Sequence, residues 1–150
     1  MNVFYEFYHI AQKLQKAGIP YALVGGVAMA FYTKPRFTKD IDILIELEHL
    51  GFFIKILKEE GYVESARPWK FKKVQLTLHR FLKIKDQDEM IIDILAADNS
   101  KYKKIIANAK IAQSDSLGQI RVVSKEDLIR MKKIRNSKLD QADIEALRND

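Results

Sequence analysis

The chain has 150 residues, of which 47% are hydrophobic and 31% charged, and this balance is typical of one globular domain spanning residues 1–150. It has no cysteine, which excludes disulfide bonds, zinc–thiolate sites and thiol catalysis. It lacks an apolar run near the ~20 residues that a membrane-spanning helix needs, and its first 18 residues do not resemble a signal peptide, so we expect a cytoplasmic protein without a membrane partner. The net charge of +6 weakly favours partners that carry phosphate, such as nucleotides or nucleic acid.

Helical and strand-like segments alternate through the first 62 residues. Apolar residues recur at helical spacing from Val3 to Leu14, and Gly18 and Pro20 end that helix. The segments predicted after it are a short buried strand over 21–26, a helix over 27–33, a loop over 34–38, a strand over 40–46 and a helix over 48–61.

The second half of the chain contains a predicted antiparallel hairpin. Residues 71–85 alternate between two faces, and the polar turn at 86–89 leads into a strand over 90–97. The segments predicted next are a helix over 99–110, a strand over 118–124, a helix over 124–135 with Ser124 as N-cap, and a last helix from the N-cap Asp140. This order predicts an α+β fold, a mixed sheet flanked by helices, with a helical tail over approximately 124–150.

Asp40 and Asp42 lie two residues apart on one predicted strand, so both side chains face the same side, opposite Ile41 and Ile43. Their oxygens can therefore bind one cation, and Mg²⁺ is typically held by one or two carboxylates plus substrate phosphates. Asp93 lies in the middle of the strand over 90–97. If the two strands are neighbours, three carboxylates form one cluster, and a metal ion would relieve their mutual repulsion.

Each feature alone also has an ordinary structural explanation. The Asp-x-Asp pattern is common, and Asp93 could lie in water or pair with Arg80 across the hairpin. Gly25 and Gly26 could form only a tight strand-to-helix turn. A helix that begins at these glycines would instead present free N–H groups to a phosphate. The combination of all these features favours a metal and phosphate site.

The stretch from Leu23 to Glu46 resembles the signature of the DNA polymerase β-like nucleotidyltransferase superfamily. Val24-Gly25-Gly26, a spacer of thirteen residues and Asp40-Ile41-Asp42-Ile43 follow its pattern, and Asp93 fits its third acid. Among its members, the chain is most similar to small stand-alone proteins of the lincosamide nucleotidyltransferase and AbiEii-like toxin groups. The tail departs slightly, because Leu139 separates Lys138 from Asp140 where a direct basic–acidic pair is common.

The resemblance implies transfer of a nucleoside monophosphate from a nucleoside triphosphate to an acceptor hydroxyl, with two Mg²⁺ ions that Mn²⁺ can replace. Asp40 and Asp42 would hold both ions. Asp93 would bind the ion beside the acceptor and take the hydroxyl proton. Gly25 and Gly26 would hold the β- and γ-phosphates of the triphosphate.

The resemblance also suggests further contacts with the nucleotide. Arg36 and Thr38 match an Arg-x-Thr element ahead of the acids, and Lys132 matches a lysine of the closing helices. Lys39 and Arg135 could also meet phosphate, although solvated surface roles are equally compatible. His79 could act as a general base, and Trp69 and Tyr32 could stack on a nucleobase. For each of these three residues an ordinary structural role is the commoner alternative.

Three functions remain open at this stage. The first is a metal-dependent nucleotidyltransferase whose acceptor is a small molecule, a tRNA or a protein, acting alone, as a homodimer or with a protein partner. The second is a non-catalytic nucleotide-binding module, such as the toxin half of a two-protein system. The third is a basic RNA-binding protein in which the acids are incidental.

Overall fold

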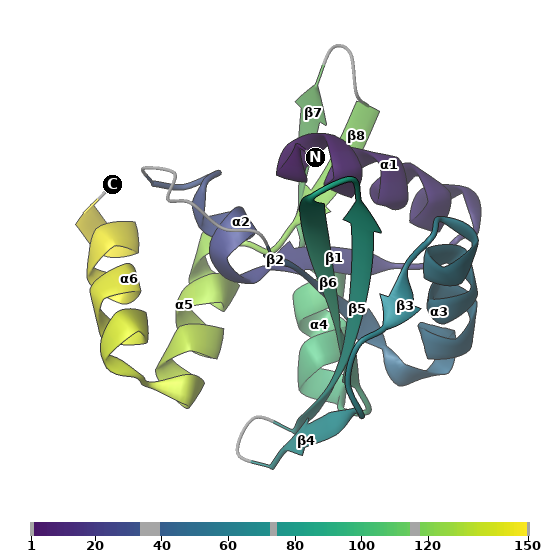
Figure 1. The fold of residues 1–150 in the computed structure, drawn as a ribbon. Coiled ribbons are helices and arrows are strands. Elements are labelled where there is room, and N and C mark those ends of the chain that lie inside the picture. Colours follow the sequence, from purple (N-terminus) through teal and green to yellow (C-terminus); the bar gives the residue numbers. More distant parts are fainter. Residues whose placement is uncertain (1, 34–39, 73–74, 115–117, 150) are drawn as a thin grey trace.

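The computed structural model describes residues 2–33, 40–72, 75–114 and 118–149, and it has the mixed sheet flanked by helices that the sequence predicts (Figure 1). None of the helices in these ranges is long and apolar enough to span a membrane. The helices are α1 (Val3–Lys16), α2 (Gly25–Met29), the 3-10 helix η1 (Leu47–His49), α3 (Leu50–Glu59), α4 (Ser100–Ala107), α5 (Lys125–Arg135) and α6 (Lys138–Asn149).

Eight strands of the described chain form one sheet. Their bounds are β1 (Tyr21–Val24), β2 (Asp40–Glu46), β3 (Val63–Glu64), β4 (Trp69–Phe71), β5 (Leu76–Lys85), β6 (Asp88–Ala97), β7 (Lys110–Ser114) and β8 (Gly118–Val122). The strand order is β3-β5-β6-β2-β1-β8-β7, and β4 also pairs with β5. Strand β2 runs parallel to β6, and β1 runs parallel to β8, whereas the other pairs are antiparallel. The predicted antiparallel hairpin is confirmed as β5–β6, but β5 begins at Leu76, Phe71 belongs to the separate strand β4, and β6 begins at Asp88 within the predicted turn.

The two faces of the sheet differ in what covers them. On one face, Glu6 of α1 accepts a hydrogen bond at 2.8 Å from the hydroxyl of Tyr62, which follows α3, and it lies 3.5 Å from Lys83 Nζ of β5. These contacts join α1 and the segment after α3 to β5. The opposite face carries Asp40 and Asp42, and α4 approaches it where Lys103 lies 3.9 Å from Glu46. The fully buried Ile41 and Ile43 point away from the acids, as the alternation of β2 requires.

The structure corrects the predicted elements between residues 99 and 114. The helix ends at Ala107, not at residue 110, and Lys110–Ser114 form the edge strand β7, which the sequence analysis missed. The side chain of Ile111 in this strand is 63% exposed. Because this apolar side chain is exposed, β7 does not show the alternation of buried apolar and exposed polar residues by which a strand is recognised in a sequence. Both residues of β3 are also exposed, so β3 lacks this pattern too.

Helices α5 and α6 form a hairpin, visible beside α2 in Figure 1. Ser124 is confirmed as the N-cap of α5, since its Oγ accepts a hydrogen bond from Asp127 N at 3.1 Å. The N-cap predicted for α6 was wrong, because Ser137, not Asp140, precedes the first helical residue. Ser137 Oγ accepts from Asp140 N, and Asp140 Oδ2 accepts from Ser137 N, each at 3.0 Å, which is a capping box.

Candidate active site

The sheet register brings three aspartates together on one face. Asp42 on β2 is the direct partner of Asp93 on the parallel strand β6, and Asp40 lies two residues before Asp42 on the same side. Across the antiparallel β1–β2 pair, Asp42 lies opposite Val24, the residue before Gly25. The acids and the glycine turn predicted to form one site are therefore neighbours in space.

Asp93 is buried, with 2% of its surface exposed, and it is paired with Arg80 across the β5–β6 hairpin. The Arg80 guanidinium donates from Nε to Oδ1 at 2.8 Å and from Nη2 to Oδ2 at 2.9 Å, and it also lies 5.4 Å from the centre of the Trp69 ring. A bidentate hydrogen bond of this kind fixes the plane of the carboxylate. The pair with Arg80, which is the ordinary structural explanation for Asp93, is therefore present, and it forms part of the aspartate cluster.

Burial and like charge act together on the other two aspartates. Burial, followed by the charges of Asp93 and Asp40 and a hydrogen bond to Asp93, raises the pKa of Asp42 to about 7, against a smaller lowering by Arg135. Burial and the charge of Asp93 also raise the pKa of Asp40. Ionisation of both carboxylates therefore costs free energy in the folded protein, and a bound cation would reduce that cost.

Gly25 is required by the packing of Asp42. Its φ of +71° lies in the left-handed region, and a Cβ at this position would collide with Asp42 Oδ2 and lie 2.9 Å from its Cγ. Gly26 follows as the second residue of α2. The Gly-Gly pattern thus allows the close approach of a carboxylate to the backbone, in addition to the phosphate approach that the sequence predicts.

A cavity of about 600 Å³ lies over the acids, with basic side chains of α5 at its other side. Lys132 and Arg135 both line it. Lys132 is buried, and its Nζ donates to Asp143 Oδ2 at 2.9 Å and lies 3.9 Å from Asp140 Oδ1. Contact between Lys132 and a nucleotide stays a prediction, since its ammonium is bound to the acids of α6.

The remaining predicted residues fall into two groups. Arg36, Thr38 and Lys39 lie outside the described residues. Of the others, His79 is the partner of Ile94 and so faces away from Arg80 and Asp93, and the Tyr32 hydroxyl donates to the backbone oxygen of Val123 at 2.6 Å.

Sequence reasoning missed one side of the cavity, which comes from β4 and the residue after it. Trp69, Lys70, Phe71 and Lys72 all line the cavity, and of these only Trp69 was considered as a stacking residue. The pairing of β4 with the start of β5 brings them there. The Trp-x-Phe alternation ahead of a long strand was the only signal of this in the sequence.

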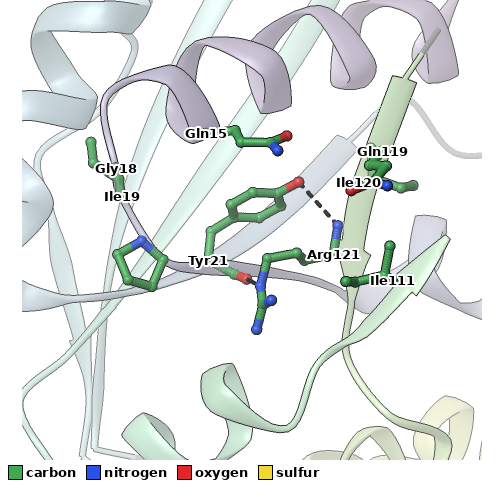
Figure 2. Close-up of a pocket in the computed structure, with 9 residues that line it drawn as sticks. Gln15, Gly18, Ile19, Tyr21, Ile111, Gln119, Ile120 and Arg121 are labelled. Carbon is green, nitrogen blue, oxygen red and sulfur yellow. Dashed lines mark hydrogen bonds between the residues drawn. The ribbon is translucent and has the colours of Figure 1, made fainter. Parts of the chain in front are cut away.

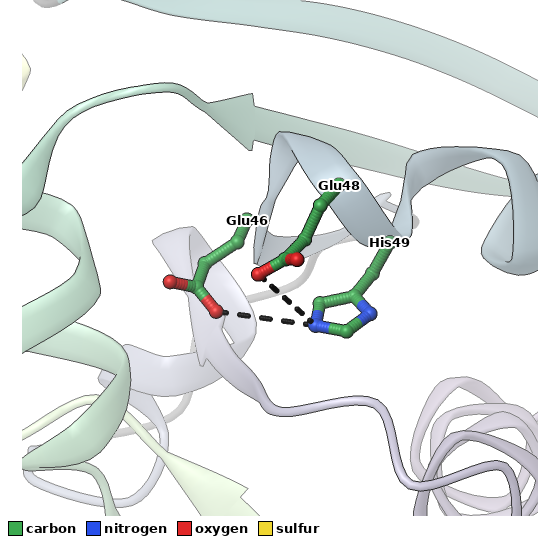
Figure 3. Close-up of side chains that lie close together, drawn as sticks. All are labelled: Glu46, Glu48 and His49. Atoms are coloured by element: carbon green, nitrogen blue, oxygen red, sulfur yellow. Dashed lines mark ion pairs between the residues drawn. The ribbon is translucent and has the colours of Figure 1, made fainter.

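A second group of potential metal ligands lies at the far end of β2. Among the described residues, Glu46, Glu48 and His49 have ligand atoms within 4.8 Å of one another (Figure 3). In the Glu46 group, His49 Nε2 lies 3.9 Å and 3.8 Å from the two glutamates, distances typical of ion pairing.

A second cavity, of about 400 Å³, lies where β8 meets the end of α1 (Figure 2). The Arg121 backbone N–H donates to the Tyr21 hydroxyl at 3.0 Å, and the guanidinium donates to the backbone oxygens of Tyr21 and Ile106. These bonds satisfy the arginine within the fold. No acidic side chain lines this cavity among the described residues.

A family model described as Aminoglycoside-2''-adenylyltransferase matches residues 6–130 of the chain. No curated protein matches it. The family match thus covers most of the chain, including all three aspartates and the glycine turn.

Solved structures share the fold. A Thermotoga maritima protein assigned as a nucleotidyltransferase aligns with a TM-score of 0.64 at 18% identity, over 95% of this chain and 88% of that one. The lincosamide antibiotic adenylyltransferase LnuA, bound to lincomycin, gives 0.56 at 18% identity, over 95% and 94%. ANT(2")-Ia in complex with adenylyl-2"-tobramycin gives 0.60 at 17% identity, over 98% and 87%. At such identities these matches support the fold and leave the substrate open.

Gly25→Ala is expected to lower the free energy of unfolding by about 2 kcal/mol or more, since alanine strains a left-handed backbone and its Cβ collides with Asp42. The matched control is Gly51→Ala, where a Cβ meets nothing within 4 Å, and this variant should be unchanged or more stable by up to about 1 kcal/mol. Urea denaturation measures both. Equal stability of the two variants would contradict the packing of Gly25 against Asp42.

Asp42→Asn is expected to raise the free energy of unfolding in metal-free buffer at pH 8. Because the folded-state pKa of Asp42 is raised to about 7, its ionisation opposes folding. The gain should vanish below the unfolded-state pKa of about 3.9, grow as the pH rises, and become constant above about 7. Urea denaturation across this range, with the exposed Asp98→Asn as control, measures the gain. A variant less stable than the parent at pH 8 would show that Asp42 is not under electrostatic strain.

Proposed function

Because the chain belongs to the aminoglycoside-2''-adenylyltransferase family, we propose that it moves a nucleoside monophosphate from a nucleoside triphosphate to an acceptor hydroxyl and releases pyrophosphate. The observation that carries this proposal is the register that sets Asp42 beside Asp93 and next to Gly25, on the floor of a cavity of about 600 Å³. The likeness to nucleotidyltransferases drawn from residues 23–46 is confirmed by the family match and by the shared fold.

The donor set fits Mg²⁺, for which we propose Asp40, Asp42 and Asp93 as ligands. All three offer carboxylate oxygens, the donors that hard divalent ions prefer. Burial first, and the charges of neighbouring carboxylates second, raise the pKa values of Asp40 and Asp42, and a bound cation would stabilise the ionised form of both. Asp93 keeps lone pairs beyond those that accept from Arg80, since each carboxylate oxygen can accept two bonds. When bound, two such ions would neutralise charge on the attacking and leaving oxygens.

The protein's own contribution to the reaction is position and proton transfer. The acceptor oxygen forms a bond to the α-phosphorus, the bond from that phosphorus to the bridging oxygen breaks, and its electrons leave with pyrophosphate. An Asp93 carboxylate oxygen takes the hydroxyl proton, and Arg80 holds that carboxylate in a fixed plane. The backbone at Gly25 and Gly26, together with Arg135, is proposed to hold the phosphates.

The test is incubation of the purified protein with each α-³²P-labelled nucleoside triphosphate, Mg²⁺ or Mn²⁺, and a cell extract as the source of acceptors. We expect a labelled product from the parent protein. For Asp40→Asn and Asp42→Asn we expect a loss of at least about 100-fold, since charge neutralisation at the reacting phosphate is the main catalytic contribution in such sites.

The matched control is Glu46→Gln, on the same strand but in the distant Glu46–Glu48–His49 group, and it should retain the parent rate. Circular dichroism shows whether each variant is folded. The proposal is wrong if the parent labels nothing with any of the triphosphates, or if both aspartate variants keep the parent rate.

A further inference from the structure

Different elements form the two sides of the cavity over the aspartates. On the side of α2 and α5 it is lined by Gly25, Leu128, Met131, Lys132 and Arg135, where the proposed function places the triphosphate. The other side, which we name the β4 wall, consists of Trp69, Phe71, Lys72, Leu76 and Leu78. Figure 1 shows β4 at the open end of the β5–β6 hairpin, opposite the turn that joins the two strands.

The sheet register joins the β4 wall directly to Asp93. Leu78 lies two residues before Arg80 on β5, and it pairs with Leu95 on β6, just as Arg80 pairs with Asp93. On its other side Leu78 pairs with Trp69. A molecule on this wall would therefore lie along the same face of the sheet as Asp93, the group proposed to take the acceptor's proton.

The β4 wall presents apolar rings with positive charge around them. The Trp69 and Phe71 rings meet edge to face with centroids 6.1 Å apart, Phe71 is 38% exposed, and the Arg80 guanidinium lies over Trp69. Lys72 also lines this side, whereas Lys70, the partner of Thr77, alternates to the opposite face of the sheet. Among the described residues, the carboxylates that line the cavity are Asp40, Asp42 and Asp93, which the proposed function assigns to metal ions.

We propose that the β4 wall is the acceptor subsite, and that its acceptor is an uncharged or anionic hydroxyl compound with a flat apolar face, not a polycationic aminoglycoside. This inference rests on the proposed function. Rings such as Trp69 and Phe71 bind flat apolar surfaces by stacking or edge contacts. A polycation would instead meet Lys72 and the Arg80 guanidinium, while the aspartates of the cavity are occupied by the proposed metal ions, and like charges placed together weaken binding.

Trp69 is the only tryptophan of the chain, so its fluorescence reports on the β4 wall without any turnover. We would titrate the protein, free of nucleotide and at saturating Mg²⁺, with 8-anilinonaphthalene-1-sulfonate as a flat anionic probe and with tobramycin as a polycation. The expected result is saturable quenching of Trp69 by the anionic probe and no response to tobramycin. Tighter binding of tobramycin than of the anionic probe would overturn the inference.

Variants test whether the probe lies on this wall. Phe71→Ala, and separately Lys72→Glu, should each weaken binding of the anionic probe by about tenfold, since each removes a principal contact. Lys72 is exposed, so its variant tests the wall even if Phe71→Ala does not fold. The control is Ile84→Ala, 66% exposed on β5 but outside the cavity, and it should bind as the parent does. Unchanged probe binding in the lysine variant would overturn the inference.

A last titration separates an acceptor subsite from a base-stacking surface for the nucleotide. The anionic probe and the Mg²⁺ complex of ATP should bind at the same time, whereas competition between them would assign the β4 wall to the nucleotide and overturn the inference. The transfer assay should likewise give no labelled tobramycin. Because the fluorescence titration needs no turnover and the transfer assay does not depend on Trp69, failure of this inference and failure of the proposed function are distinguishable.

Discussion

Repulsion among Asp40, Asp42 and Asp93 is the constraint from which the rest of the site follows. The alternation of β2 sets the first two on one face, and the parallel register of β2 with β6 sets the third directly beside Asp42. A fold selected for stability alone would not gather partly buried carboxylates in this way, because burial and like charge each disfavour the ionised form. The fold must supply positive charge around them or leave room for it.

The structure does both. Arg80 reaches Asp93 across the β5–β6 hairpin, and Arg135 approaches Asp42 from α5 closely enough to lower its pKa. These bases are themselves held in place, Arg80 against Trp69 and Arg135 by Asp140. Groups oriented before a substrate arrives need no reorganisation during the reaction, which is how electrostatic catalysis gains its strength. Burial and the charges of neighbouring carboxylates disfavour the ionised forms of Asp40 and Asp42, and this cost is the physical basis for proposing metal ions.

What the sequence could predict was limited by the range of the interactions involved. The shared face of Asp40 and Asp42 follows from the two-residue period of one strand, and the Arg80–Asp93 pair follows from a hairpin with a short turn. The pairing of β2 with β6 joins segments about fifty residues apart, so the sequence could state the three-acid cluster only as a condition. The burial of Lys132 depends on Asp143, eleven positions later on another helix, which no local pattern reveals.

The errors have local physical causes as well. Helix α6 begins after Ser137 and not after Asp140, because these two residues form a reciprocal capping box. Asp140 also accepts a hydrogen bond from the Arg135 guanidinium. Strand β7 escaped prediction because it pairs at the sheet edge with an exposed isoleucine. Strand β4 was missed because its three residues are too few to show a period, although they help to form one side of the cavity.

The most direct test of the central claim, that the three aspartates form a cation site, is anomalous diffraction from crystals grown with Mn²⁺ and a non-hydrolysable ATP analogue. We predict anomalous density within coordination distance of Asp40 and Asp42, with Asp93 as a further ligand. Density confined to the Glu46–Glu48–His49 group, or none near the aspartates at saturating Mn²⁺, would contradict the account.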